Sequence, residues 1–444
     1  MSGPRIAMIG AGSVVFARAL TSDILSFPEL ANAQIRLHDI DRRRLETAEM
    51  MVRSVAKTLG ANPTIVSSLD RKAALRDADY VINSIQVGGH DATLRDFDIP
   101  KKYGLRQTIA DTLGIGGIFR ALRTIPVMLD ICADMRAECP DALLLNYTNP
   151  MVMLCLAVER FGGVPVVGLC HSVQHTARVL ADFAGVARDD VWYRVAGINH
   201  MSWFLDFRRR NGEDLYPRLW EALDDPARFG KDAVRFEMMR RLGYFVTESS
   251  EHMSEYLPYF IKRQSEVDRL NIPIDEYIRR SERNLNRAEE ERARLDRGEA
   301  VEVKKSDEFA AYIIHSIVAN KDWSFHGNVL NRGLIDNLPS DTVVEVPILV
   351  NAAGLQPCHV GALPPQLAGL NRTNIATQQL VVEAAVTGNR DHVYHAAMLD
   401  PHTSSMLTLD EIWHMVDDLI DAHGSLLPRM TSKRLQTFVP AAAR

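Results

Sequence analysis

The sequence has few cysteines, no long apolar run and no recognisable signal peptide. Its 444 residues include 5 cysteines, an odd and scattered set that argues against a disulfide framework and for a reducing cytoplasm. No apolar run approaches the length of a membrane span, and the first residues lack the charged and apolar segments of a signal peptide. We therefore expect a cytoplasmic protein with no membrane partner.

An excess of one charge is also missing. Lys and Arg number 51 against 57 Asp and Glu, a net charge of −6, which gives no general attraction for nucleic acid or anionic membranes. Hydrophobic residues make up 46% and charged residues 24%, as in globular proteins with a large buried core. The length suffices for two domains.

Short apolar runs alternate with helical patterns in the first part of the chain. This order predicts an α/β fold with a doubly wound, mostly parallel, Rossmann-like sheet over residues 1–195. A mixed α and β domain for substrate binding and catalysis is expected over residues 196–444. The strand candidates are 5–10, 34–39, 64–66, 80–82, 142–145 and 164–168 in the first part, and 193–207 and 342–350 in the second.

A glycine loop, Gly10-Ala11-Gly12, follows the first predicted strand and opens a helix. Gly10 permits a tight turn, Gly12 lets the backbone approach a pyrophosphate, and the helix start at Ser13 and Val14 offers amides and a positive dipole. Val15 stands where a third glycine is usual. A glycine turn without a ligand is the structural alternative.

Asp39 ends the second predicted strand, where its carboxylate could accept hydrogen bonds from an adenosine ribose. That position favours NAD, although Arg42, Arg43 and Arg44 keep the 2′-phosphorylated cofactor open. We also place Asn146, at the end of a later strand, beside the cofactor.

Cys170 follows a predicted strand, and His200 comes shortly after it in the chain. A thiolate and a neutral imidazole are good ligands for a divalent transition metal, and two protein ligands leave positions open for substrate oxygens. Asn149 also follows a strand and should face the same crevice. The alternative is a buried core cysteine and a structural histidine.

Asp111 lies in a glycine-rich loop ahead of a helix, where it could reach a substrate or merely cap the helix. The segments 248–252 and 255–259 concentrate polar and aromatic residues. We interpret both, taken alone, as surface and packing residues.

These motifs, in this order, resemble glycoside hydrolase family 4, the NAD- and metal-dependent glycosidases, and the Cys-His-Ser-Val form is similar to its α-galactosidase branch. The resemblance spans nearly the whole chain and rests on Gly10-Ala11-Gly12-Ser13, Asp111-Thr112 with Gly116-Gly117, Asn149-Pro150-Met151, Cys170-His171-Ser172-Val173, Gly197-Ile198-Asn199-His200 and Phe325-His326-Gly327-Asn328. The segment 243–252, from Gly243 to His252, also looks like the α-galactosidase branch.

The resemblance implies a mechanism without a carboxylate pair. NAD⁺ takes a hydride from sugar C3, a base removes the C2 proton, and the glycosidic bond breaks by elimination. Water then adds and the hydride returns. A metal such as Mn²⁺ acts as Lewis acid.

By the same resemblance, Cys170 and His200 are the metal ligands, Asn149 holds sugar hydroxyls, and Tyr256 is the base. A tyrosine needs a lowered pKa for that role, which a nearby cation could provide. His171 and Asp111 are both candidates to assist the leaving group, and His171 could also contact the sugar. A lactate/malate dehydrogenase type of second domain and a homodimer or homotetramer are implied as well.

Three other functions stay open. Arg95 and the arginines of 279–297 could bind the carboxylate of an α-galacturonide or α-glucuronide. A 2-hydroxy-acid dehydrogenase of the lactate/malate type would share the two-domain architecture. A binding or scaffold protein is the remaining alternative, but it has no use for a cofactor loop beside a metal pair.

Overall fold

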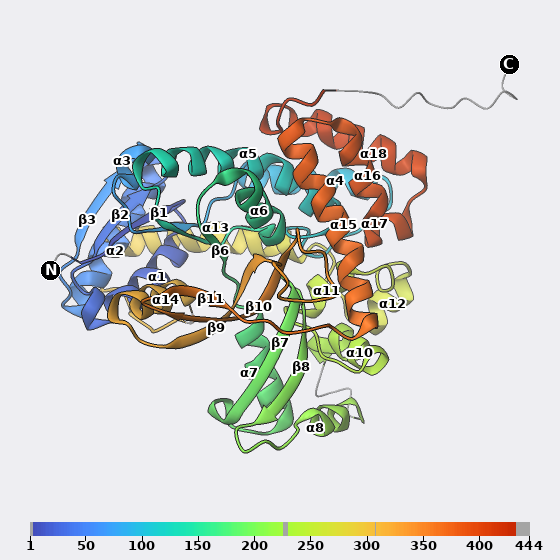
Figure 1. Cartoon of the computed structure of the whole chain (residues 1–444). Helices are drawn as coiled ribbons and strands as arrows, with labels where there is room; N and C mark the ends of the chain where they lie inside the picture. The colour runs from blue at the N-terminus through green and yellow to red at the C-terminus, as the bar shows by residue number, and fades with distance from the viewer. Residues whose placement is uncertain (1–2, 225–229, 307, 432–444) are drawn as a thin grey trace, which may run out of the picture.

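One continuous sheet runs through the computed structural model, which describes residues 3–224, 230–306 and 308–431. The strands lie in the order β3-β2-β1-β4-β5-β6-β9-β10-β7-β8, and β11 pairs with β10 (Figure 1). They are β1 (Arg5–Ile9), β2 (Gln34–His38), β3 (Thr64–Ser68), β4 (Tyr80–Asn83), β5 (Leu143–Asn146), β6 (Val166–Gly168), β7 (Val191–Ile198), β8 (Met201–Arg209), β9 (Trp323–Leu330), β10 (Val343–Asn351) and β11 (Gly354–Pro357).

Helices cover this sheet, and α15 to α18 gather beside α4 and α5 (Figure 1). Their bounds are α1 (Val14–Leu25), α2 (Arg42–Leu59), α3 (Arg71–Leu75), α4 (Gly89–Lys102), α5 (Gly114–Glu138), α6 (Met151–Ala157), α7 (Ser172–Ala184), α8 (Tyr216–Glu221), α10 (Ala233–Leu242), α11 (Ser250–Tyr256), α12 (Gln264–Arg269), α13 (Glu276–Asp296), α14 (Phe309–Ala319), α15 (Pro365–Thr387), α16 (Arg390–Leu399), α17 (Pro401–Met406) and α18 (Leu409–His423).

The first half of the sheet confirms the predicted doubly wound fold. Strands β1 to β6 are parallel and lie in the order 3-2-1-4-5-6 of dinucleotide-binding sheets. Local signals set its elements: α2 begins after Asp41, whose side chain accepts a hydrogen bond from the N–H of Arg44, and it buries an apolar face that includes Leu45 and Val52.

The second half is antiparallel, and few backbone pairs join it to the first. Strand β6 meets β9 at Gly168 and Asn328, β9 places Asn328 opposite Glu345, and β10 meets β7 at Glu345 and Gly197. These four residues form one row across the sheet. The turns that carry both predicted metal ligands lie directly beyond the row, so this junction sets the distance between them.

The predicted domain boundary at residue 195 falls inside β7. The strands on either side belong to the same sheet, and one hydrophobic cluster runs through both halves. The division into domains 1–195 and 196–444 therefore stays a prediction.

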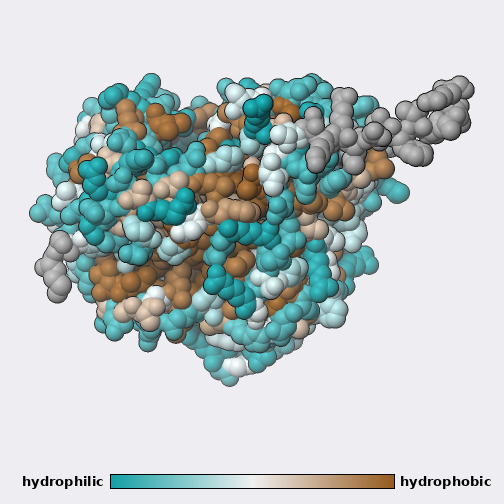
Figure 2. All heavy atoms as spheres, turned by 45° about the horizontal axis from the view of Figure 1, so that its top comes forward, coloured by the Kyte–Doolittle hydropathy of each residue, from teal (hydrophilic) through white to brown (hydrophobic). Residues whose placement is uncertain are grey.

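The surface seen in Figure 2 is mostly hydrophilic, with hydrophobic residues gathered across the middle of that face and at its lower left. Among the described residues, no helix is both long enough and apolar enough to span a bilayer.

Candidate functional site

The glycine loop after β1 brings the backbone against Asp39. Gly10 adopts φ +83°, which favours glycine, and the N–H of Gly12 donates to Asp39 Oδ2 at 2.8 Å. A Cβ on Gly12 would stand 2.5 Å from that oxygen. Ser13 is exposed and its side chain does not cap α1. The first amides of α1 are thus available to a phosphate. The side chain of Val14 lies outside the described part of the structure.

Asn146 is enclosed rather than presented to a cofactor. It is fully buried, its Nδ2 donates to the carbonyl of Thr148 at 3.0 Å, and its Oδ1 accepts from Asn83 Nδ2 at 2.9 Å. These bonds shape the turn that leads from β5 to Asn149. A direct contact with the cofactor stays a prediction.

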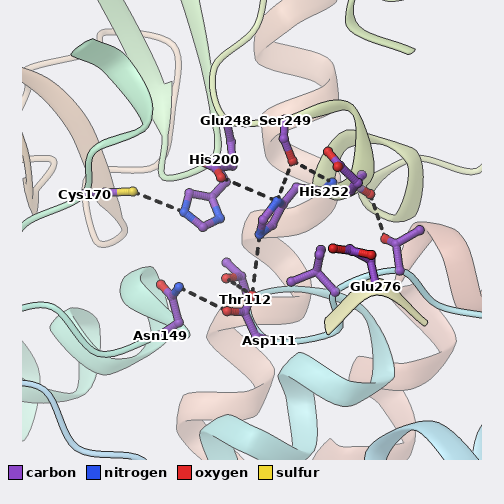
Figure 3. A network of polar contacts seen from close by, with 12 residues as sticks. Asp111, Thr112, Asn149, Cys170, His200, Glu248, Ser249, His252 and Glu276 are labelled. Carbon is purple, nitrogen blue, oxygen red and sulfur yellow. Dashed lines mark hydrogen bonds and ion pairs between the residues drawn. The ribbon is translucent and has the colours of Figure 1, made fainter. Parts of the chain in front are cut away.

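The structure brings Cys170 and His200 together. Cys170 lies just beyond β6, His200 lies in the turn between β7 and β8, and Sγ is 3.2 Å from Nε2 (Figure 3). The carboxylate of Glu248 completes a group whose ligand atoms all lie within 4.8 Å of one another. Cys170 is partly exposed, unlike Cys155, whose burial raises its pKa to about 12. A buried core cysteine is therefore not what the structure has at position 170.

Asp111 and Asn149 lie across from this pair (Figure 3). Asn149 Nδ2 is 3.4 Å from Asp111 Oδ2, and His252 Nε2 is 3.7 Å from Asp111 Oδ1. Burial opposes the charge of Asp111, but the interaction with His252 and the positive charge of Arg120 outweigh it and hold its pKa well below the usual range. Asp111 is thus ionised near neutral pH. Asn149 Oδ1 is buried and has no hydrogen-bond partner among the described residues, which leaves it free for a ligand hydroxyl.

Glu255 holds the loop that presents Asp111. Its buried carboxylate accepts hydrogen bonds from the backbone N–H groups of Thr108, Ile109 and Ala110, with Thr108 N at 2.9 Å and Ala110 N at 2.7 Å. Ala110 itself has φ +52°, a conformation that costs a side-chain-bearing residue of the order of 1 kcal/mol. The carboxylate therefore offsets strain directly before Asp111.

His171 precedes α7 and is half exposed, with 44% of its side chain accessible. Its Nε2 lies 2.9 Å from Oε2 of Glu308, a buried carboxylate before α14. Burial lowers the pKa of His171, but the hydrogen bond with Glu308 and its charge outweigh burial and raise that pKa to about 9. At neutral pH His171 carries a proton that it can donate.

Tyr256, the predicted base, ends α11 and is fully buried. Its hydroxyl lies 3.0 Å from His200 Nδ1, on the opposite side of that ring from Cys170. Burial and the negative charge of Asp111 raise the pKa of Tyr256 well above its ordinary value. The protein alone therefore shifts this pKa away from what a base needs, and a cation in the site would have to reverse the shift.

Sequence reasoning missed three residues of the site. Glu248 and His252 belong to a segment that we interpreted as surface and packing, and Glu308 carried no signal at all. The clue for the first two was positional, because segment 243–252 shares the family resemblance.

The comparisons with known proteins agree with this geometry. The sequence model for "Family 4 glycosyl hydrolase" matches residues 5–186, and that for its C-terminal domain matches residues 195–403. This chain belongs to family 4 of the glycosyl hydrolases. The predicted family is confirmed, and membership favours a glycosidase over the dehydrogenase and scaffold alternatives.

Two relatives are similar over nearly their whole length. An α-galactosidase of Bacillus subtilis is 48% identical over 96% of this chain and 99% of that protein. An α-galactosidase of Rhizobium meliloti is 35% identical over 97% of this chain and 90% of that protein.

Two solved structures share the fold. A 6-phospho-α-glucosidase from gut microorganisms, in complex with NAD and Mn²⁺, has a TM-score of 0.83 at 21% identity and covers 97% of this chain and 100% of that chain. Malate dehydrogenase from Plasmodium falciparum has a TM-score of 0.52 at 16% identity, covering 88% and 99%. The predicted fold class, a Rossmann-like sheet with a mixed second part of the lactate/malate dehydrogenase type, is confirmed.

Proposed function

We propose that this family 4 glycosyl hydrolase is an α-galactosidase that depends on NAD and a divalent metal ion such as Mn²⁺. The near-full-length likeness to the α-galactosidase of Bacillus subtilis carries the proposal. The Cys-His-Ser-Val form at residues 170–173 supports the same branch.

The residues fit both groups. The soft thiolate of Cys170 and the imidazole of His200 suit a transition metal, and the loop at Gly12 with the uncapped start of α1 suits a pyrophosphate. When bound, the nicotinamide exchanges a hydride with the sugar and the ion serves as a Lewis acid for its hydroxyl oxygens.

The remaining roles fall to this chain's own side chains. Asn149, with its unpartnered Oδ1, and the ionised Asp111 bind sugar hydroxyls. Tyr256 takes the proton from C2. His171 donates a proton to the leaving oxygen, because it is protonated near neutral pH whereas Asp111 has no proton to give. The protonation states of the two residues support His171 over Asp111 as the group that assists the leaving oxygen.

Hydrolysis of an aryl α-galactoside is the test. Activity should require NAD⁺, Mn²⁺ and a reductant that keeps Cys170 a thiol, and turnover in D₂O should place deuterium at sugar C2. Full activity after exhaustive removal of the cofactor and chelation of metal would refute the proposal.

An α-galacturonide is the competing substrate, but four of the cations that would favour it are engaged in other contacts. Arg95 donates to the carbonyl of Ala422 at 3.0 Å, and Arg279, Arg280 and Arg283 all pair with Glu276. Assays of matched aryl α-galactosides and α-galacturonides separate the two, and faster turnover of the uronide would overturn the substrate assignment.

A further inference from the structure

Glu248 stands beside the Cys170–His200 pair although it comes from a different part of the chain. It lies just before α11, and one of its carboxylate oxygens belongs to the group of ligand atoms within 4.8 Å of one another. In Figure 3, Glu248, His200 and Cys170 converge from three separate segments. A carboxylate is thus close to both predicted metal ligands.

No hydrogen bond within the described residues engages this carboxylate, although, against the effect of burial, the charges of His200, His252 and Arg235 lower its pKa. Its nearest ionic contact is His252 Nδ1 at 3.6 Å, too long for a hydrogen bond, and that nitrogen is already engaged by Ser249 Oγ at 2.8 Å. Only 24% of the Glu248 side chain is exposed. A largely buried carboxylate without a hydrogen bond is costly unless something else neutralises it.

The backbone around Glu248 is held in place by buried groups. Glu248 has φ +73°, in the left-handed region, which costs about 1–3 kcal/mol for a residue other than glycine. Arg235 Nη1 donates to its carbonyl oxygen at 2.6 Å and to Thr176 Oγ1 at 3.0 Å, and Arg235 is itself buried and paired with Asp232. His200 is also left-handed, with φ +64°. The fold therefore maintains a strained backbone at both Glu248 and His200, whose side chains belong to the same group of possible ligand atoms.

We propose that Glu248 is a third protein ligand of the divalent ion, and that it completes a thiolate–imidazole–carboxylate set with Cys170 and His200. The inference rests on the proposed function, since both require the ion. A carboxylate is a hard ligand that suits Mn²⁺ better than the thiolate does. Together the thiolate and carboxylate also balance the charge of a divalent ion. A six-coordinate ion would keep three positions for sugar oxygens and water.

The alternative role for Glu248 is that of a hydrogen-bond acceptor for a sugar hydroxyl. The two roles differ in the absence of sugar, because only a ligand contributes to metal affinity in the free protein. The decisive measurement is therefore Mn²⁺ affinity without substrate or NAD, determined by electron paramagnetic resonance of free Mn²⁺ and by calorimetry.

Glu248→Ala should weaken Mn²⁺ binding by at least about 100-fold, since even residues that only orient metal ligands are worth roughly 10- to 100-fold. Glu248→Gln, which keeps the size of the side chain, should weaken it by a smaller factor and serves if the alanine variant is unstable. In the Co²⁺-loaded protein, the visible spectrum should change in both variants.

Glu251→Gln is the matched control. Glu251 lies in the first turn of α11 and pairs with Arg280 at 3.2 Å, so this variant removes the same charge from the same segment away from the cluster. Its Mn²⁺ affinity should equal that of the wild type. Equal affinities of wild type and folded Glu248→Ala would overturn the assignment of Glu248 alone. A wild-type protein that binds neither Mn²⁺ nor Co²⁺ would instead overturn the metal site and the proposed function.

Discussion

The imidazole of His171 and the carboxylate of Glu308 lie 2.9 Å apart, although 137 positions (308 − 171) separate them in the chain. Burial disfavours the charged imidazole, but this hydrogen bond and the charge of Glu308 raise the pKa of His171 to about 9. The pair stabilises the fold fully below the ordinary pKa of 6.5, and that contribution is lost as the pH rises through about 9. It also keeps a proton on His171 near neutral pH, which the proposed leaving-group role requires.

Replacing Glu308 by Gln should narrow the pH range of activity. Without the negative charge, the pKa of His171 falls toward its ordinary value, so kcat should begin to decline at a lower pH than in the wild type, whose decline is expected near pH 9. The pH profile of kcat is the measurement. Glu302→Gln, at an exposed residue paired with Lys304, should leave the profile unchanged, and identical profiles for Glu308→Gln and wild type would refute the role of Glu308.

Gly12→Ala should impair cofactor binding. The new Cβ would stand 2.5 Å from Asp39 Oδ2 and 2.7 Å from Arg44 Cβ, so the loop must shift at a cost of about 1–3 kcal/mol. We expect NAD affinity, measured by calorimetry, to fall at least about tenfold, the equivalent of 1.4 kcal/mol.

Gly369→Ala provides the contrast for Gly12→Ala. Gly369 lies in the exposed part of α15, and nothing lies within 4 Å of a Cβ added there. That substitution should stabilise the protein by roughly 0.5–1 kcal/mol without changing NAD affinity. Unchanged NAD binding in Gly12→Ala would mean that the loop does not contact the cofactor.

The sequence predicted the parallel half of the sheet and much of the site for one reason. Parallel strands end at a common edge, so Cys170 after β6 and Asn149 after β5 had to meet there. His200 was predictable as a ligand type, but its position depends on the single backbone pair between Glu345 and Gly197. No local pattern encodes that pairing.

The residues that sequence reasoning missed are placed by long-range packing. Glu248 is oriented by Arg235, and Glu308 reaches His171 only because α14 packs against α1 and the sheet. The direction of the Tyr256 pKa shift also could not be predicted from the sequence. The family resemblance calls for a lowered value, whereas the complete burial of this side chain raises it.

Tyr256→Phe tests two roles of this side chain: the proposed base that removes the C2 proton, and the partner of His200 Nδ1. Loss of a base should reduce kcat by about 10²- to 10⁴-fold and abolish deuterium exchange at sugar C2. Loss of the 3.0 Å contact with His200 Nδ1 should weaken Mn²⁺ binding by about tenfold, as expected for a group that orients a ligand.

Tyr259→Phe, at a half-exposed position three residues further along, should change neither quantity. If Tyr256→Phe weakened Mn²⁺ binding but kept C2 exchange, Tyr256 would only position His200, and the base would have to be another residue.

Glu345 occupies the row across the sheet junction as a buried acid, and we expect it to be protonated below about pH 7. Ser202 Oγ lies 2.9 Å from the carbonyl of Ile198 and 2.6 Å from Glu345 Oε2. The single hydroxyl hydrogen cannot serve both contacts at once. An ionised Glu345 takes this hydrogen from the carbonyl, whereas a neutral Glu345 that donates to Ser202 Oγ leaves it to the carbonyl. Burial raises the pKa of Glu345 to about 7, against the opposing effect of the hydrogen bond with Ser202.

Glu345→Gln and Glu345→Ala should therefore behave differently. A carboxyl whose pKa is raised in the folded state loses stability as the pH rises from about 4.5 to about 7, by an amount on the order of 3 kcal/mol. Glu345→Gln keeps a donor and an acceptor, so its urea-unfolding free energy should lack this decline while Mn²⁺ affinity is retained. Glu345→Ala removes one partner each from Ser202 and Asn328 and leaves a cavity, so it should lose roughly 2–4 kcal/mol at every pH. If Glu345→Gln lost metal affinity, the charge of Glu345 would be the required feature, and the neutral acid would be refuted.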